Sequence, residues 1–186
     1  MEFNICLVER HKISSLNTEE ETRENKVLEI MREKEYDSEL DDATSVIFDI
    51  CSIFEETRKI KFLVQGFGDD SWPVDCRYDL PNIIEDMHYF IKNKILSGNY
   101  NFQLRFDEQG IQRYIDVKDK GGELELICHS YTGWRPVPES VKINKNEFSK
   151  KMMKLYNDFI VYASELCPLL ISQPMLSEWK IIEDRH

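Results

Sequence analysis

The fold of this chain is decided by the stretch from Lys59 to Trp134, whose centre reads GFGDDSWPVD at positions 66–75. Apolar and polar side chains alternate over residues 59–65, which predicts a strand with one buried face. Gly66 and Gly68 follow at once, and both can adopt the positive φ angles that a tight turn requires. The chain is therefore expected to reverse direction here and to continue the sheet beyond the turn.

The segment after the turn predicts a short strand at 72–78 and then an amphipathic helix. Pro73 lacks a backbone N–H, so it is expected at the start of that strand or on a sheet edge. Asp79 is a suitable N-cap residue, and Pro81 suits the first helical turn. Apolar residues then recur at helical spacing and define one face: Leu80, Ile83, Ile84, Met87, Ile91 and Ile95.

The second half of the chain predicts an antiparallel meander followed by a long helix. Residues 102–106, 111–117 and 123–128 alternate between apolar and polar side chains and are joined by short turns that contain glycine. Asn144 is placed to cap the helix, and Pro168 is expected to end it. The core-facing side chains of this helix recur at intervals of three and four: Phe148, Met152, Leu155, Phe159, Tyr162 and Leu166.

Two apolar runs near the N-terminus complete the predicted core. Residues 3–8 predict a first strand. Residues 45–51 are rich in β-branched side chains and predict a buried strand, with a helix over 46–58 as the alternative. Together these elements predict an α+β fold, with an antiparallel sheet of about five to seven strands and two main helices packed on one face.

Length and composition indicate one domain over residues 1–186, with an acidic appendage. The chain has 186 residues, 41% of them hydrophobic, and a net charge of −11. Residues 17–42 contain eleven acidic and four basic side chains and predict either an exposed helix or a flexible acidic arm, which leaves 43–186 as the globular body. A charge of this sign disfavours nucleic acid and anionic membranes as partners and favours a basic protein.

The sequence also predicts a cytoplasmic protein. It contains no window of about 18 apolar residues, so no transmembrane helix is expected. Residues 1–6 lack the basic and apolar regions of a signal peptide. The five cysteines are odd in number and widely spaced, which favours free thiols in a reducing compartment: Cys6, Cys51, Cys76, Cys128 and Cys167.

No residue pattern predicts catalysis, and we expect no enzyme activity, no metal site and no cofactor. Cys128 and His129 are adjacent, but neighbouring side chains on a strand point to opposite faces, so they are not expected to form a metal site or a nucleophile–base pair. Gly66 and Gly68 form half of a phosphate-binding motif, and the aspartates that follow would repel a phosphate. Three carboxylate pairs are predicted to be solvated residues of turns or of an exposed helix side: Asp69–Asp70, Glu85–Asp86 and Asp107–Glu108.

Four short segments resemble bacterial immunity proteins, which pair with polymorphic toxins such as those of contact-dependent growth inhibition systems. The segments are Phe67–Asp75, Asp79–Leu80, Glu108–Ile111 and Ser130–Trp134. The resemblance implies a protein that binds the toxin of its own strain, for instance a nuclease, and occludes its active site or substrate groove. The acidic arm is not part of this pattern. The alternative function is a non-catalytic adaptor or regulatory module that binds proteins within a larger assembly.

The residues predicted to bind the partner, a basic toxin domain, are Asp69, Asp70, Trp72, Trp134 and Arg135. They lie on turns next to large aromatic side chains, and loops on a rigid sheet are common positions for binding residues. Tryptophan and arginine are frequent hot-spot residues, and the acidic turn would steer a basic partner. The alternative interpretation is that Trp72 and Trp134 cover the ends of the core.

Overall fold

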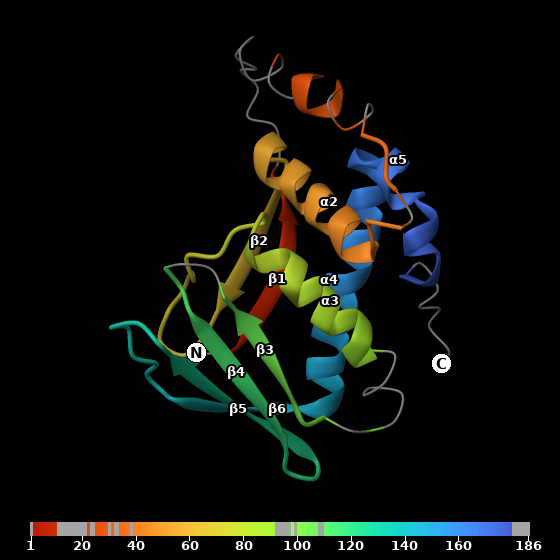
Figure 1. Ribbon diagram of the computed structural model, residues 1–186. Coiled ribbons are helices and arrows are strands. Elements are labelled where there is room, and N and C mark those ends of the chain that lie inside the picture. The colour runs from red at the N-terminus through yellow and green to blue at the C-terminus, as the bar shows by residue number, and fades with distance from the viewer. Residues whose placement is uncertain are drawn as a thin grey trace.

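The structure is a computed structural model that describes residues 2–10, 22, 25–29, 31, 34–37, 39–91, 98, 100–107 and 110–179 (Figure 1). The helices and strands, in chain order, are β1 Asn4–Glu9, α2 Ala43–Thr57, β2 Ile60–Gln65, α3 Asp79–Phe90, β3 Phe102–Phe106, β4 Arg113–Asp119, β5 Glu123–Ser130, β6 Ser140–Asn144, α4 Lys145–Leu166, α5 Pro168–Ile171 and the 3₁₀ helix η2 Pro174–Trp179. The strands predicted at 3–8, 59–65, 102–106, 111–117 and 123–128 are confirmed to within two residues.

The strands form two antiparallel sheets, so the prediction of one sheet with five to seven strands is wrong, although the α+β class holds. β1 pairs with β2, and β3, β4, β5 and β6 form a four-stranded meander in that order. Residues 72–78, predicted as a strand, form no ladder. Trp72 donates its backbone N–H to the Val64 carbonyl (2.9 Å), and the chain then leads into α3. The sheet is split because no strand after the turn joins β2 to the meander.

Residues 45–51 belong to α2, so the strand predicted there is wrong and the alternative helix is confirmed. Asp42 caps this helix, because its side chain accepts a hydrogen bond from the Ser45 N–H (3.0 Å). Burial of one helical face outweighs the strand preference of the β-branched residues. The described part of the chain thus has three long helices, α2, α3 and α4, instead of two. The buried side chains of α2 recur at helical spacing: Val46, Ile47, Ile50, Cys51, Ile53 and Phe54.

The predicted cap of α4 is confirmed, whereas that of α3 is wrong. The Asn144 side chain accepts hydrogen bonds from the N–H groups of Asn146 and Glu147. Asp79 is not the N-cap of α3 but a buried residue of its first turn, where its side chain accepts from the N–H of Asp75 (3.1 Å). The predicted extension of this helix to Ile95 lies outside the described residues. No helix in the described ranges is long and apolar enough to cross a membrane.

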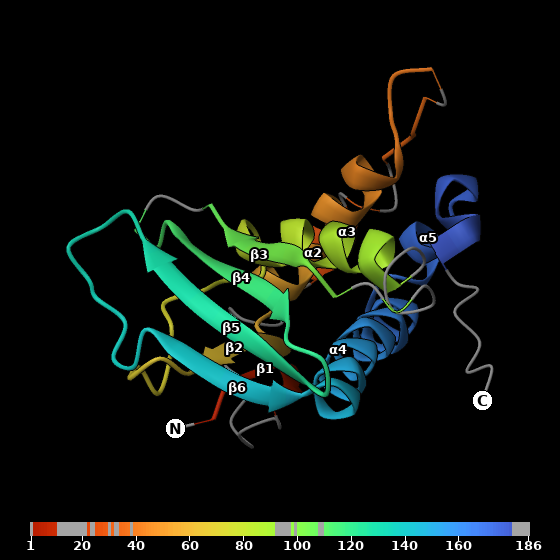
Figure 2. The same cartoon turned by 90° about the horizontal axis from the view of Figure 1, so that it is seen from below.

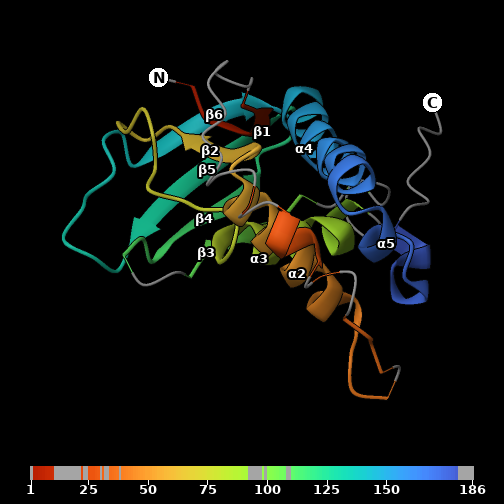
Figure 3. The ribbon, with the colours of Figure 1, turned by 90° about the horizontal axis from the view of Figure 1, so that it is seen from above.

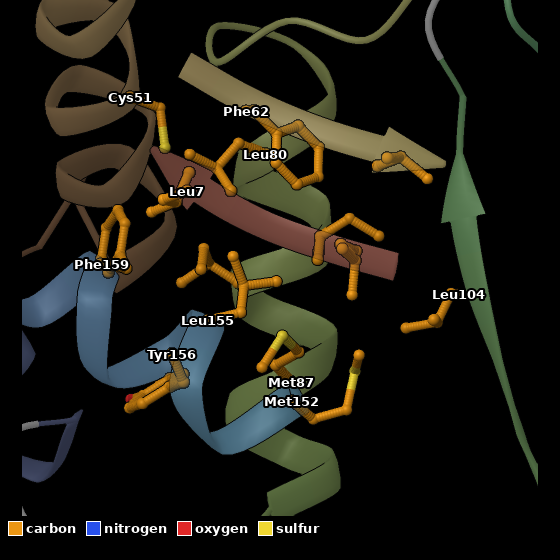
Figure 4. Close-up of a cluster of buried hydrophobic side chains, with 14 of the residues drawn as sticks. Leu7, Cys51, Phe62, Leu80, Met87, Leu104, Met152, Leu155, Tyr156 and Phe159 are labelled. Atoms are coloured by element: carbon orange, nitrogen blue, oxygen red, sulfur yellow. The ribbon is translucent and has the colours of Figure 1, made fainter. Parts of the chain in front are cut away.

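The core lies between the helices and the inner faces of both sheets. Side chains from α2, α3, α4 and three of the strands converge in the cluster drawn in Figure 4: Leu7, Cys51, Phe62, Leu80, Met87, Leu104, Leu155 and Phe159. Figure 3 shows the helices grouped at one end of the molecule, beside the sheets. Figure 2 looks onto the outer face of the four-stranded sheet, and no helix of the described residues crosses that face.

The end of the predicted acidic arm is packed against α2. Residues 25–29 are helical, and Val27 contacts the core. Asp49 of α2 is buried and bonds to Lys34 and to the Tyr36 hydroxyl (2.7 Å). Burial and the hydrogen bond to Asp49 hold the pKa of Tyr36 well above its ordinary value. The start of the predicted arm, residues 17–21, lies outside the described residues.

Candidate functional site

Arg113 is a cation on the inner side of the four-stranded sheet. It is the first residue of β4, where it stands opposite Phe106 of β3 and Ser130 of β5. Arg113 is only 5% exposed. The guanidinium carbon lies 4.6 Å from the centre of the Trp72 ring and 3.5 Å from that of Trp134. Both indoles therefore offer a π face to the charge, an interaction that strengthens when the cation is removed from water.

Asp69 supplies the counter-charge. Its Oδ2 accepts a hydrogen bond from Arg113 Nη1 at 3.2 Å, and its side chain keeps 24% exposure. The Nε atom of Arg113 is buried and has no hydrogen-bond partner among the described residues. The cation is therefore held by one carboxylate and two aromatic rings. We refer to Asp69, Trp72, Arg113 and Trp134 as the Arg113 cluster.

A tight turn at residues 66–69 places Asp69 over the sheet. Gly66 and Asp69 exchange both backbone hydrogen bonds, at 2.9 and 3.1 Å. Phe67 and Gly68 have φ of 57° and 86°, and positive φ at both central positions is what a type I′ turn requires. The Trp72 Nε1–H donates to the Gly66 carbonyl (3.2 Å), so the indole is fixed to the turn. The turn predicted from the two glycines is confirmed.

The loop between β5 and β6, residues 131–139, is fastened to this turn. The Val137 N–H donates to the Phe67 carbonyl (2.8 Å). A Cβ at Gly68 would lie 2.2 Å from the Val137 carbonyl oxygen, so only glycine permits this approach. The Trp134 ring meets the Trp72 ring edge-on, 5.9 Å between centroids. These contacts hold the turn and the loop together as one unit around the Arg113 cluster.

Three of the five residues predicted to bind a partner meet inside this unit. Trp72 is 3% exposed and packs edge-on against Phe106 at 5.1 Å, so it covers the core as the alternative interpretation stated. Trp134 is half-buried. Asp69, predicted to be solvated, is instead paired with buried Arg113, because the turn aims its carboxylate at the sheet.

The other two predicted residues lie on the surface of the same unit. Asp70 is exposed beside Asp69, and its carbonyl accepts a hydrogen bond from the Gln65 side chain (2.7 Å). Arg135 is exposed in the loop, where its Nη1 donates to the carbonyls of Thr132 (2.7 Å) and Trp134 (3.1 Å). Both charged side chains are thus available to a partner.

Two further residues of the loop are exposed and were not among the predicted partner-binding residues. Tyr131 is 75% exposed and Val137 is 72% exposed. Tyr131 also contacts Tyr114, which stacks on His129 on the outer face of the sheet, at 5.4 and 4.5 Å between centroids. We define the rim as the four exposed residues Asp70, Tyr131, Arg135 and Val137. Its members are aromatic, aliphatic and charged, as are the residues of many protein-binding surfaces.

Sequence reasoning missed Arg113 as the organising residue, although a signal was present. Positions 113, 115 and 117 are the buried positions of β4, and Arg113 is the one charged residue among them. A buried arginine needs a carboxylate or an aromatic partner. Asp69, Trp72 and Trp134 lie far from Arg113 in the sequence, so spacing alone could not connect them.

Cys128 lies on β5, within reach of the charge of Arg113. Burial raises the pKa of the Cys128 thiol to about 12, even though Arg113 acts in the opposite direction, so the thiol stays protonated at neutral pH. Cys128 is buried and His129 is partly exposed, on opposite sides of β5 as predicted. Within the described ranges, no group of three His, Cys, Asp or Glu side chains is placed to hold a metal ion.

Comparisons of the chain with protein-family models, with curated proteins and with solved structures give no match. A function must therefore be argued from the residues and their geometry.

Proposed function

We propose that this protein is a non-catalytic toxin-binding protein of the immunity type, which neutralises a toxin of its own cell by covering the toxin's active site or substrate groove. The rim is the observation that supports the proposal. Its exposed side chains stand on a turn and a loop that the Arg113 cluster and the Val137–Phe67 hydrogen bond hold together. A surface that is already fixed loses little conformational entropy on binding.

The charge distribution indicates that the acidic turn is not the main source of attraction for a basic toxin. Arg113 neutralises Asp69, and the rim carries one charge of each sign, Asp70 and Arg135. Long-range steering is therefore expected from the net charge of the whole chain, −11, rather than from the turn at 66–69. The same net charge opposes nucleic acid or an anionic membrane as the partner.

The first experiment identifies the toxin by co-purification with the tagged chain from its native cells, followed by mass spectrometry. Affinity is then measured for Tyr131→Ala and for Val137→Ala, each of which should weaken binding by about tenfold or more if the rim supplies hot-spot contacts. Inhibition of the toxin's activity should weaken in parallel. Leu169→Ala is the matched control, because Leu169 is an exposed apolar residue of α5. Figure 1 shows α5 on the other side of the molecule from the loop between β5 and β6.

Two outcomes would contradict the proposal. Wild-type affinity and inhibition in both rim variants would exclude the rim as the binding surface. A co-purified partner that is not inhibited by the chain would favour the adaptor function instead.

A further inference from the structure

The guanidinium of Arg135 is held in place by its own loop, although the residue is exposed. Its Nη1 atom donates to the carbonyl oxygens of Thr132 (2.7 Å) and Trp134 (3.1 Å). A long side chain in water samples many rotamers, and ordering it during binding is unfavourable. Because the folded loop already orders Arg135, a partner that binds this side chain meets a group of fixed orientation.

The two carbonyl groups that hold this guanidinium are themselves fixed. The Trp134 N–H donates to Oγ1 of Thr132 (3.3 Å), which closes a short turn. The Tyr131 N–H donates to the Gln112 carbonyl (3.0 Å), and the Trp134 ring stacks on Arg113 of β4. The segment that carries the guanidinium is therefore anchored to the four-stranded sheet and to the residue just before β4.

The remaining donors of Arg135 lie together on one edge of the planar group. Nη1 uses its N–H bonds for the loop carbonyls, which leaves the Nε–H and the two N–H bonds of Nη2. The Nε–H and one N–H of Nη2 point in the same direction, and this pair matches the two oxygen atoms of a carboxylate. Among the described residues, no group accepts a hydrogen bond from this edge.

The described part of the chain also places no acid of its own against Arg135. Asp69 is engaged by Arg113, and neither Asp70 nor the exposed Glu139 of the same loop forms an ion pair with Arg135. The chain has 35 acidic and 24 basic residues, so acids are not in short supply. The free edge of Arg135 is thus a fixed, unoccupied pair of donors on the rim.

We propose that Arg135 binds a carboxylate side chain of the toxin, an aspartate or a glutamate, through two parallel hydrogen bonds from Nε and Nη2. The inference rests on the proposed function, because the other rim residues supply the surrounding contacts. Tyr131 and Val137, exposed in the same loop, would exclude water from the ion pair and so strengthen it.

The binding of one acid by an acidic protein would make the contact selective. The net charge of −11 attracts the basic surface of the toxin, whereas the single acid opposite Arg135 fixes how the two surfaces align. A phosphate group could meet the same edge, but its larger negative charge is repelled more strongly by the chain.

The first test needs no toxin. The Nε–H signal of Arg135 in the isotope-labelled full chain is followed during titration with sodium acetate, with sodium chloride at equal ionic strength as the blank. Acetate should shift this signal at least about threefold further than the Nε–H signal of Arg58. Arg58 is an exposed arginine without a side-chain hydrogen bond among the described residues. Its sequence neighbours include Lys59 and Lys61, so an effect of positive charge alone would favour Arg58.

The second test uses the toxin that co-purifies with the chain. Arg135→Lys keeps the charge but removes the paired donors, and it should weaken the affinity for the toxin by about tenfold. Arg58→Lys is the same exchange at an exposed position outside the rim and should leave the affinity unchanged.

Three results would overturn the inference. The first is an acetate shift at Arg135 no larger than that at Arg58. The second is a larger excess of the Arg135 shift over the Arg58 shift with inorganic phosphate than with acetate, which would assign the site to phosphate. The third is wild-type affinity for the toxin in Arg135→Lys.

The two proposals fail separately. Wild-type affinity in Tyr131→Ala and Val137→Ala would remove the proposed function and leave the acetate result standing. Weakened binding in these two variants, together with wild-type affinity in Arg135→Lys, would keep the proposed function and remove the carboxylate site.

Discussion

Arg113 is stacked on Trp134, with its guanidinium carbon 3.5 Å from the centre of the indole ring. The contact joins the start of β4 to the loop between β5 and β6. Since Trp134 also meets Trp72, the charge ties that loop to the turn at 66–69. A buried cation thus sets the relative position of the two surface segments that form the rim.

The pairing of Asp69 with Arg113 predicts that Asp69→Asn destabilises the protein. The substitution leaves a buried guanidinium without its carboxylate, and we expect the free energy of unfolding to fall by about 1–3 kcal/mol. The expected loss is smaller than for a fully buried pair because the Asp69 side chain is 24% exposed. Urea denaturation measures it. Asp70→Asn is the matched control and should change stability by less than about 0.5 kcal/mol; equal effects of the two substitutions would contradict the role assigned to Asp69.

Gly68→Ala should also destabilise the protein, by about 2–4 kcal/mol, because it combines an unfavourable positive φ with a steric clash. The added Cβ would lie 2.2 Å from the Val137 carbonyl oxygen. Gly121→Ala is the control, since Gly121 has a similar φ of 92° and a Cβ added there would meet no atom within 4 Å. That variant should lose only about 1–2 kcal/mol, the conformational part. Equal losses in thermal melts of the two variants would show that the contact between turn and loop is not tight.

Phe159→Ala tests the face that α4 turns to the core. Phe159 is buried and meets Phe54 of α2 edge-on at 5.8 Å between centroids. Removing the ring should lower the free energy of unfolding by about 3–5 kcal/mol. Val161→Ala, two residues away on the exposed side of the same helix, should cost less than about 0.5 kcal/mol. A loss below about 1 kcal/mol for Phe159→Ala in denaturant melts would be inconsistent with this packing.

Alkaline pH should destabilise the protein through its buried thiols. Burial raises the pKa of Cys76, Cys128 and Cys167 to about 12 in the folded chain. In the unfolded chain a thiol has a pKa of about 8.5, so the unfolded state loses protons first as pH rises. The stabilising effect of the protonated, buried thiols is complete below a pH of about 8.5 and is lost progressively toward pH 12. The free energy of unfolding falls by about 1 kcal/mol per thiol for each pH unit above 9. Urea melts at pH 7 to 10.5 measure this dependence.

A variant identifies the thiols as the cause of the alkaline effect. Cys167→Ala should reduce the slope of stability against pH above 9 while leaving the slope near neutrality unchanged. An unfolding free energy that stays constant up to pH 10.5 would show that the thiols are ionised equally in both states.

The sequence could predict those elements in which capping residues and the spacing of apolar side chains match the burial in the folded chain. Asn144 caps α4 as expected, and the alternating residues of β3, β4 and β5 form the expected meander. The strand prediction for residues 45–51 was wrong because it relied on the strand preference of β-branched side chains. The helical spacing of Val46, Ile50 and Ile53, which are all buried, is the pattern that matches the observed helix. The split into two sheets could not be predicted, because it depends on where the chain goes after Trp72 and not on any local pattern.

The candidate site was predictable only in part. Asp69, Trp72 and Trp134 were identified from residue type and turn position, yet no local pattern indicated that they surround one cation. Asp69 and Arg113 are 44 residues apart along the chain. Only the pairing of β4 with its neighbours brings the arginine under the turn. Tyr131 and Val137 were missed because exposure of an apolar side chain is a property of the folded surface.

The inward position of Arg113 has a consequence for how β4 finds its partners during folding. A slip of β4 by two residues would keep its apolar side chains turned toward the core, so hydrophobic packing discriminates weakly against it. Such a slip would move the guanidinium away from Asp69 and from both indoles, leaving a buried charge without compensation. Arg113 therefore favours the correct register of β4, because it destabilises mispaired sheets in addition to stabilising the native one.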